Sequence, residues 1–541
     1  MSTADGIFSP PIPVNEPVRG YAPGSVERAS IQARLESMGN EKWDLPNVIG
    51  GEHRRSNNTI DVVEPHQHSN VIGHLHLASE VDIQDAFNAA AAAKEDWANA
   101  SWEDRAAVFL KAAELLQGPW RDEMNASTML GQSKTVHQAE IDAACELIDF
   151  WRYNVAFARQ IIAEQPQSTS QIWNRSDHRP LEGVVAAISP FNFTSIAANL
   201  PTAPALMGNT VVWKPSNTQA HSANVIIRLL ETAGLPKGVI NLVHENGPQF
   251  GEAMLNRRDL AGVHFTGSTE TFQSIWKGIA GRLETYRSYP RLVGETGGKD
   301  FILAHPSADP ESLAVAICRG GFEFQGQKCS AASRIYLPSN LANTVIERCQ
   351  GIISEMNMGD VRDFSNFLSA VIDRKSFDKI SRYVDLAKST AQVLTGGNCE
   401  DSQGFFIEPT LVQVDDPKHR LMEEEIFGPL VSVYVYNETD FEAACKLVDT
   451  TSPYALTGAV FAQDRHVLSK ASDALRYSAG NFYLNDKPTG AVVGMQPFGG
   501  GRTSGTNDKA GSVLNLLRWV SPRSIKENLV PPVDWKYPFL G

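Results

Sequence analysis

The chain has 541 residues, which is too long for one hydrophobic core, so we expect two or three domains. Hydrophobic residues make up 42% and charged residues 20%, which is the composition of an ordinary globular protein. The net charge of −14 argues against a surface that binds nucleic acid or an anionic membrane.

The six cysteines lie far apart and form no C-x-x-C pair, so we expect free thiols in a reducing compartment. Residues 1–6 are neither apolar nor rich in arginine, and no apolar run approaches the length of a membrane span. A cytoplasmic protein is therefore expected. A mature organellar protein that has lost its presequence is the alternative.

The first 78 residues predict an arm followed by strands. Residues 1–45 are rich in proline, glycine and charge, which favours a surface arm. Residues 46–78 alternate polar and apolar side chains, as β-hairpins do. This stretch holds His66, His68, His74 and His76. We interpret them as exposed alternate strand positions, and we expect no metal site because there is no H-E-x-x-H motif and no nearby cysteine.

From Ser79 to Ala163 the pattern becomes helical. Ser79 suits a helix N-cap, and Asp82 stands where a full capping box would have Glu or Gln. Apolar residues recur at three- and four-residue spacing in Ala86–Trp97, Trp102–Gln117 and Ala139–Ala158. Glu146 in the last run is either an ordinary polar helix position or a carboxylate that faces a pocket.

Strands and helices then alternate, which predicts an α/β fold. Apolar strand runs occupy residues 183–188, 209–213, 238–243 and 260–265, and a helical segment spans His221–Ala233. This rhythm implies a parallel sheet with helices on both faces, and nucleotides bind such sheets at the carboxyl ends of the strands. A second α/β series runs from Phe301 to about Gly480, and Leu517–Val520 in the tail reads as a strand.

The common nucleotide motifs are absent from the sequence. No stretch matches G-x-G-x-x-G, and Gly297-Gly298-Lys299-Asp300 lacks parts of a P-loop, so an ordinary Rossmann enzyme and a P-loop hydrolase are both disfavoured. The Gly267-Ser268 turn instead follows a strand and precedes a helix, where N–H groups and a hydroxyl meet a pyrophosphate.

Two residues in glycine-rich contexts suggest covalent catalysis on a carbonyl. Cys329 supplies a nucleophile, and the carboxylate of Glu295 is suited to activating the water that releases an acyl group. Alone, each residue would more often be structural.

Six motifs together resemble the aldehyde dehydrogenase superfamily, in order and spacing, over nearly the whole chain. They are Phe191-Asn192-Phe193, Trp213-Lys214-Pro215-Ser216, Phe265-Thr266-Gly267-Ser268, Gly294-Glu295-Thr296-Gly297-Gly298-Lys299, Gly326-Gln327-Lys328-Cys329 and Glu425-Ile426-Phe427-Gly428-Pro429. Within the superfamily, the chain resembles the branch that oxidises L-glutamate γ-semialdehyde to L-glutamate in proline degradation. The details are Gly294-Glu295-Thr296, residues 489–500, and Gly505-Thr506-Asn507-Asp508-Lys509.

The resemblance implies an aldehyde dehydrogenase fold in three parts. A Rossmann-like NAD-binding domain covers 1–168 and 190–294, and an α/β catalytic domain covers 295–501. Residues 169–189 and 502–541 form a β-hairpin oligomerisation flap, so the protein is at least a homodimer. A proline dehydrogenase is a possible transient partner, but no such domain fits within this chain.

The resemblance also assigns roles to residues. Cys329 forms the thiohemiacetal and the thioester, Asn192 stabilises the oxyanion, and Glu295 activates water. The NAD cofactor is held by Lys214, Ser268, Gly267, Glu425, Phe427 and Ser189. Asn217 stands where many NAD-preferring relatives have an acidic residue. The substrate is held by Ser330, Gly490, Ala491, Phe193, Phe498 and Glu146. Ala491 stands where relatives often have serine, which keeps a backbone N–H but not a hydroxyl.

Three other functions compete with this interpretation. One is another semialdehyde dehydrogenase, such as one that acts on succinate semialdehyde. The second is the CoA-acylating branch, which Glu295 disfavours because hydrolysis needs a base. The third is a binding protein on an inactive version of the fold, which the presence of Cys329, Glu295 and Asn192 together disfavours.

Overall fold

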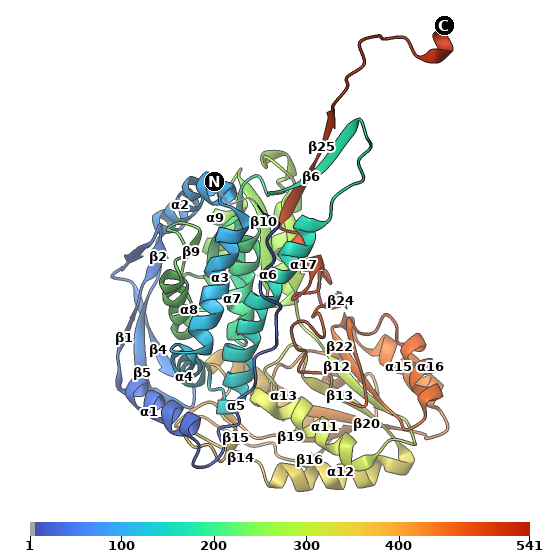
Figure 1. Ribbon diagram of the computed structural model, residues 1–541. Coiled ribbons are helices and arrows are strands. Elements are labelled where there is room, and N and C mark those ends of the chain that lie inside the picture. The colour runs from blue at the N-terminus through green and yellow to red at the C-terminus, as the bar shows by residue number, and fades with distance from the viewer. Residues whose placement is uncertain (1–5) are drawn as a thin grey trace.

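A computed structural model describes residues 6–541 as two α/β units with a projecting hairpin (Figure 1). The first unit is built on a seven-stranded sheet. Its strands run in the order β11 (Arg291–Glu295), β10 (Leu260–Thr266), β7 (Val184–Ser189), β8 (Thr210–Pro215), β9 (Ile240–Leu242), β2 (Asn47–Ile49) and β3 (Glu52–Arg54). The five strands from β11 to β9 are parallel, as the alternating pattern predicted, and β2 and β3 close one edge in antiparallel register.

Helices cover both faces of this first sheet. One face packs against α3 (Trp102–Gln117), α6 (Leu147–Ala163), α7 (Thr194–Leu206) and α8 (Ala220–Ala233). The other packs against α2 (Glu80–Asn99), α9 (Gly247–Leu255) and α10 (Thr269–Ala280). Ser79 is the N-cap of α2, and the shorter Asp82 side chain completes the capping box that we expected Glu or Gln to make.

The second unit holds another seven-stranded sheet. Its order is β16 (Gln392–Thr395), β19 (Thr410–Val414), β20 (Leu430–Tyr436), β13 (Ala332–Pro338), β12 (Asp300–Ala304), β22 (Thr457–Phe461) and β23 (Asn481–Leu484). All neighbours are parallel except β16 and β19. It is flanked by α11 (Pro310–Phe322), α12 (Ser339–Ser354), α13 (Arg374–Thr390), α15 (Phe441–Thr451) and α16 (Arg465–Ala474).

The N-terminal region is more ordered than an arm. Residues 6–25 are extended, but α1 (Val26–Asn40) and β1 (Trp43–Leu45) follow, and β1 joins β5 (Gln67–His76) and β4 (Thr59–Glu64) in a small sheet. The expectation that the four histidines are exposed was wrong for His66 and His76, whose relative exposures are 1% and 9%. His66 instead hydrogen-bonds Ser133, and no cluster of three or more candidate metal ligands occurs within residues 6–541.

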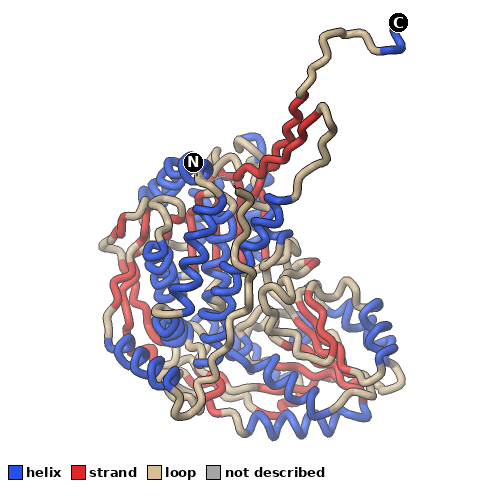
Figure 2. Tube along the Cα trace, in the orientation of Figure 1, coloured by secondary structure: helices blue, strands red, loops and turns tan. Residues whose placement is uncertain are grey.

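The projecting hairpin is shorter than the expected flap. It pairs β6 (Ile172–Pro180) with β25 (Val520–Asn528) in antiparallel register and stands clear of both units (Figure 2). Residues 184–189, which we placed in the flap, form β7 in the first sheet. Residues 502–519 also return to the body of the protein, where α17 (Val513–Leu517) replaces the start of the expected strand at 517–520. Within residues 6–541, no helix is both long and apolar enough to span a membrane.

Candidate active site

The backbone that leads into Cys329 is tightly turned. Residues 324–326, between α11 and β13, have φ values of 51°, 55° and 64°. Residues with a Cβ rarely adopt positive φ, so surrounding contacts must hold this segment in place. The side chain of Gln325 donates hydrogen bonds to the carbonyls of Ser133 at 3.1 Å and Ala370 at 2.7 Å. The thiol is therefore presented from a fixed turn.

Cys329 lies where two cavities meet. It is partly buried and lines both of them. Burial raises the pKa of its thiol well above the ordinary value, and the nearby carboxyl groups of Asp300, Glu295 and Glu425 raise the pKa further. A reactant that enters through one cavity can therefore meet, at this sulfur, a second reactant held in the other.

The first cavity brings together every residue expected to bind the substrate. These are Ser330, Gly490, Ala491, Phe193, Phe498 and Glu146. The remaining wall includes Ile141, Phe150, Ile196 and Val493, so the middle of the cavity is largely apolar. Ser330 Oγ lies 2.7 Å from the hydroxyl of Thr489.

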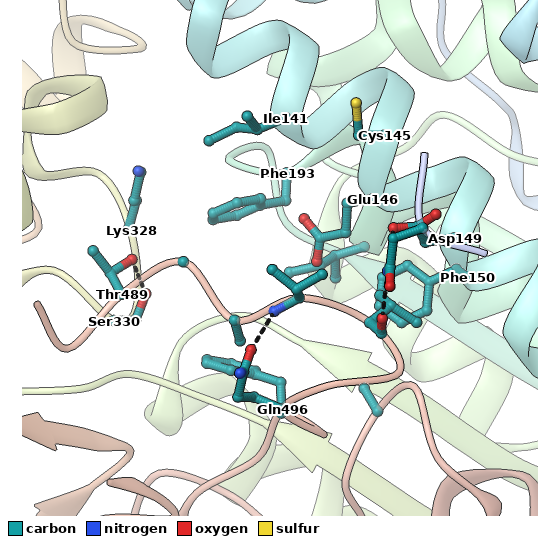
Figure 3. A pocket seen from close by; sticks show the side chains of 18 of the residues that line it. Ile141, Cys145, Glu146, Asp149, Phe150, Phe193, Lys328, Ser330, Thr489 and Gln496 are labelled. Atoms are coloured by element: carbon teal, nitrogen blue, oxygen red, sulfur yellow. Dashed lines mark hydrogen bonds between the residues drawn. The ribbon is translucent and has the colours of Figure 1, made fainter. Parts of the chain in front are cut away.

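The two ends of the first cavity carry opposite charge (Figure 3). At the end near Ser330, Lys328 donates to Glu323 at 2.9 Å, and Lys487 lies 3.7 Å from the same carboxylate. Despite burial, the two lysines hold the pKa of Glu323 at about 2. Two ammonium groups thus share one anion, and this end suits a carboxylate.

The other end of the first cavity is acidic. Glu146 and Asp149 lie side by side there (Figure 3). Burial raises the pKa of Glu146 to about 8 and that of Asp149 to about 6. An entering ammonium group would favour the ionised form of these carboxyls. This end therefore suits a cation.

A π-helical segment turns Glu146 toward this cavity. The expected helix at 139–158 contains a π-helix over Glu140–Glu146 before α6 begins. The wider turn shifts side chains around the axis relative to a continuous α-helix, and such segments are frequent at functional sites. Of the two interpretations of Glu146 that the sequence left open, the geometry favours the carboxylate that faces a pocket.

Asn192 lines the second cavity together with Cys329, whereas Glu295 lines neither cavity but is near enough for its charge to raise the pKa of the thiol. Asn192, which follows β7, is 3% exposed and donates one N–H to the carbonyl of Gln327 at 3.1 Å. An amide carries two N–H groups, so a second is available for an oxyanion. Glu295 ends β11, and burial raises its pKa well above the ordinary value. Its Oε2 is buried and has no hydrogen-bond partner within residues 6–541. Such a carboxyl can accept a proton from water.

The second cavity lies at the carboxyl ends of parallel strands β7, β8 and β10. Its lining residues include Asn192, Ser216, Gly267, Ser268, Thr296, Gly297, Glu425 and Phe427. Ser268 is the N-cap of α10, so the positive end of that helix points toward the cavity. This is the edge at which α/β sheets bind nucleotides.

Two of the residues expected to bind the cofactor do not line the second cavity. Ser189 Oγ accepts a hydrogen bond from the indole N–H of Trp213 at 2.9 Å, which directs this hydroxyl toward Trp213. Lys214 lies at the end of β8, where burial lowers its pKa to about 8. Within residues 6–541, its ammonium group donates a hydrogen bond only to the Pro215 carbonyl. The buried Oδ1 of Asn217 has no partner there.

Glu425 forms the opposite wall of the second cavity. Its Oε1 accepts from the backbone N–H of Gly298 at 2.9 Å. A Cβ at Gly297 would lie 2.4 Å from Oε2, so only glycine lets this carboxylate sit so close to the chain. With helix-end donors on one side and a carboxylate that can accept ribose hydroxyls on the other, the cavity fits a dinucleotide.

Residues 132–134, which sequence analysis missed, connect the loops that carry Asn192 and Cys329. Gln132 donates to the Phe191 carbonyl at 2.6 Å. The buried ammonium of Lys134 lies over the rings of Phe193 and Phe324, at 4.2 and 4.5 Å from their centres.

Lys134 also forms a buried ion pair with Asp142, with Nζ at 2.7 Å from Oδ2. Asp142 in turn accepts hydrogen bonds from the backbone N–H groups of Thr194 and Ser195 at the start of α7. No local pattern marks Lys134 in the sequence, because the two rings under its ammonium group come from distant segments.

The comparisons agree with this geometry. Residues 53–523 match the aldehyde dehydrogenase family. The delta-1-pyrroline-5-carboxylate dehydrogenase of Dictyostelium discoideum is 48% identical over 98% of this chain and 96% of its own length. The human mitochondrial protein of the same name is 46% identical over 97% of this chain and 94% of its own length. The chain belongs to the aldehyde dehydrogenase family.

Solved structures of similar proteins have the same fold as this chain. The delta-pyrroline-5-carboxylate dehydrogenase of Mycobacterium tuberculosis, solved with NAD bound, is 53% identical, with a TM-score of 0.96 over 99% of this chain and 100% of that one. The proline utilization A protein of Bdellovibrio bacteriovorus is 27% identical, with a TM-score of 0.90 over 95% of this chain but 53% of that chain.

Lys134 gives a first prediction. Lys134→Met keeps an unbranched side chain but removes the cation between Phe193 and Phe324. We expect kcat for aldehyde oxidation to fall on the order of tenfold or more, because a shift of about 1 Å in the reacting groups costs on the order of a hundredfold. Lys446→Met, on the exposed side of α15, is the matched control. An unchanged kcat in folded Lys134→Met protein would show that the cation does not position these loops.

The raised pKa values give a second prediction. The roles expected of Cys329 and Glu295 require both groups to be deprotonated, and burial favours the protonated form of each. The rate of aldehyde oxidation should therefore rise from about pH 7 to about pH 9 as protons are lost. Steady-state rates across this range, with melting temperature as a control for folding, measure it. A rate that falls over the same range would contradict the assignment.

Proposed function

We propose that the protein oxidises L-glutamate γ-semialdehyde, the open form of Δ1-pyrroline-5-carboxylate, to L-glutamate in proline degradation. The observation that carries this is the meeting of two cavities at one thiol. One cavity fits a dinucleotide, and the other is apolar in the middle with a basic end and an acidic end. The names of the relatives support the same substrate.

The first cavity offers a basic group and backbone N–H groups for a carboxylate, and an acidic group for an ammonium group, and the substrate carries both of these charges on one carbon atom. Glutamate semialdehyde carries a carboxylate and an ammonium group at the end remote from the aldehyde. The carboxylate is held by Ser330 and the N–H groups of Gly490 and Ala491, near Lys328. The ammonium group lies toward Glu146, and Phe193 and Phe498 flank the carbon chain.

Catalysis follows from the groups around Cys329. Its thiolate attacks the aldehyde carbon, and the oxygen that becomes negative receives a hydrogen bond from Asn192. Bound NAD supplies the acceptor for the hydride that this carbon loses. Glu295 then takes a proton from water, the hydroxide attacks the thioester, and the carbon–sulfur bond breaks. Cys329 leaves as thiolate and the product as carboxylate.

NAD would occupy the second cavity. Ser268 and the N–H groups that start α10 hold the pyrophosphate, with Gly267 allowing the close approach. Glu425 holds the nicotinamide ribose, and Phe427 packs beside it. Lys214 reaches the adenosine ribose from the end of β8, while Ser189 supports this wall through its carbonyl, which accepts the Ser216 N–H at 3.0 Å.

The assembly and partners extend this proposal. Residues 6–168 and 184–294 serve cofactor binding, and 295–501 serve catalysis. The projecting β6–β25 hairpin pairs with a second copy, so the protein is at least a homodimer; the exposed Trp173 on β6 supports this.

The chain corresponds to about half of a proline utilization A protein, which supports transient contact with a proline dehydrogenase. We place the protein in the cytoplasm.

Turnover of two aldehydes, glutamate semialdehyde and succinate semialdehyde, tests the proposed substrate. We expect kcat/KM to be highest for glutamate semialdehyde and clearly lower for succinate semialdehyde, which has the carboxylate but no ammonium group for Glu146. Equal or higher values for succinate semialdehyde would favour the alternative semialdehyde dehydrogenase.

Gly490 gives a third prediction. It has φ of +96°, and a Cβ there would lie 2.9 Å from Lys487 Nζ, so Gly490→Val strains the turn that presents the N–H groups. Activity toward glutamate semialdehyde should fall on the order of a hundredfold. Propanal has no carboxylate and should lose much less. An equal loss for both aldehydes would make this turn merely structural.

A further inference from the structure

The N-terminal arm forms part of the wall of the first cavity. Asn15 and Glu16 line it together with residues from the catalytic unit and α6. In Figure 1 the arm is the dark blue coil segment that runs along α6. A segment at the start of the sequence therefore meets a loop near its end.

Asn15 ties these two parts together with all of its polar atoms. Its Nδ2 donates to the carbonyl of Val493 at 2.8 Å and to Asp149 Oδ2 at 2.8 Å. Its Oδ1 accepts from the hydroxyl of Tyr153 at 2.9 Å. Asp149 and Tyr153 are on α6, whereas Val493 belongs to residues 489–496, which we call the anchor loop. One amide thus links α6 of the first unit to the loop that holds the substrate carboxylate.

Apart from Asn15, the anchor loop is bonded to other residues at Thr489, whose hydroxyl lies 2.7 Å from Ser330 Oγ and whose carbonyl accepts from Lys487 Nζ at 3.0 Å. The N–H of Val492 donates to Gln496 at 3.0 Å, and the N–H groups of Met495 and Gln496 return to Val492, so these bonds stay within the loop. Within residues 6–541, the bond from Asn15 to the Val493 carbonyl is the only hydrogen bond that joins residues 490–496 to a segment outside the loop. The loop is therefore held at Thr489 on one side of Gly490 and Ala491, and at Val493 by Asn15 on the other side.

The arm itself is held independently of Asn15. The N–H of Glu16 donates to Asp149 Oδ1 at 2.8 Å, and its carboxylate pairs with Arg121 at 2.6 Å and Arg152 at 3.0 Å. Further along, the hydroxyl of Tyr21 donates to Glu140 at 2.8 Å. Loss of the Asn15 amide should leave the arm in place and release only the loop.

We propose that Asn15 is a positioning residue that sets the anchor loop, and hence the carboxylate-binding N–H groups of Gly490 and Ala491, at the correct distance from Cys329. This inference rests on the proposed function. It makes the arm a determinant of selectivity for carboxylate-bearing aldehydes. No sequence motif around Asn15 indicates this role.

The test compares two aldehydes in Asn15→Ala and in the isosteric Asn15→Asp, which keeps the acceptor for Tyr153 but loses both N–H donors. For glutamate semialdehyde we expect kcat/KM to fall about tenfold or more, chiefly through KM, because the loop no longer presents its N–H groups. For propanal we expect a change within about twofold. The dissociation constant of L-glutamate, measured by calorimetry, should rise by a factor similar to KM.

Asn40→Ala is the matched control, because the Asn40 side chain bonds only to Glu36 within α1. Equal loss for both aldehydes, or an unchanged ratio in both folded variants, would overturn the inference. Failure of the proposed function would look different: the parent protein itself would show no preference for glutamate semialdehyde over propanal. Melting temperatures show that each variant is folded.

Discussion

The site depends on a single constraint: one sulfur atom must reach two cavities, each of which is lined by residues of both units. The second cavity lies between the carboxyl ends of the first sheet and Glu425 of the second unit, and the first cavity lies between α6 and residues 489–498. Neither cavity alone could perform an oxidation. Bringing an aldehyde and a hydride acceptor to opposite sides of one carbon requires the loops from both units to be fixed relative to each other.

Buried polar contacts provide that fixed relation. The left-handed backbone at 324–326 would be strained without partners, and Gln325 secures it to Ser133 and Ala370. The ammonium of Lys134, paired with Asp142, lies over the rings of Phe193, next to Asn192, and Phe324, in the turn before Cys329. Removing one member of a buried pair is costly because it leaves the other charge uncompensated. Such contacts hold geometry rather than add stability, and the Asn15 amide does the same for the anchor loop.

Much of the fold could be predicted from the sequence, because local patterns carry it. Apolar runs separated by helical periodicity gave the parallel sheet, and Ser79 marked the start of α2. The errors lie where distant segments decide the outcome. His66 is buried because Ser133 and Asp360, from distant segments, lie beside it, which the alternating strand pattern does not show. Residues 184–189 belong to the first sheet because β8 and β10 pair with them on both sides.

The candidate site divides in the same way. The resemblance of motifs named the residues that the first cavity gathers, from Ser330 to Glu146, although their roles stay predictions. It could not name Lys134, Lys487 or Asn15, because each acts through partners far away in the chain. The π-helix that turns Glu146 toward the cavity also has no signature in a 3.6-residue pattern. The sequence does not show which distant segments come into contact, and these contacts position the reacting groups.

The central claim, that Cys329 forms an acyl-enzyme which Glu295 helps to hydrolyse, is tested most directly by rapid mixing of Glu295→Gln with NAD and propanal. The account predicts a burst of NADH equal to the concentration of sites, followed by slow turnover, and a propionyl group on the Cys329 peptide after acid quenching. Slow turnover without a burst, or an acyl group on a different cysteine, would contradict it.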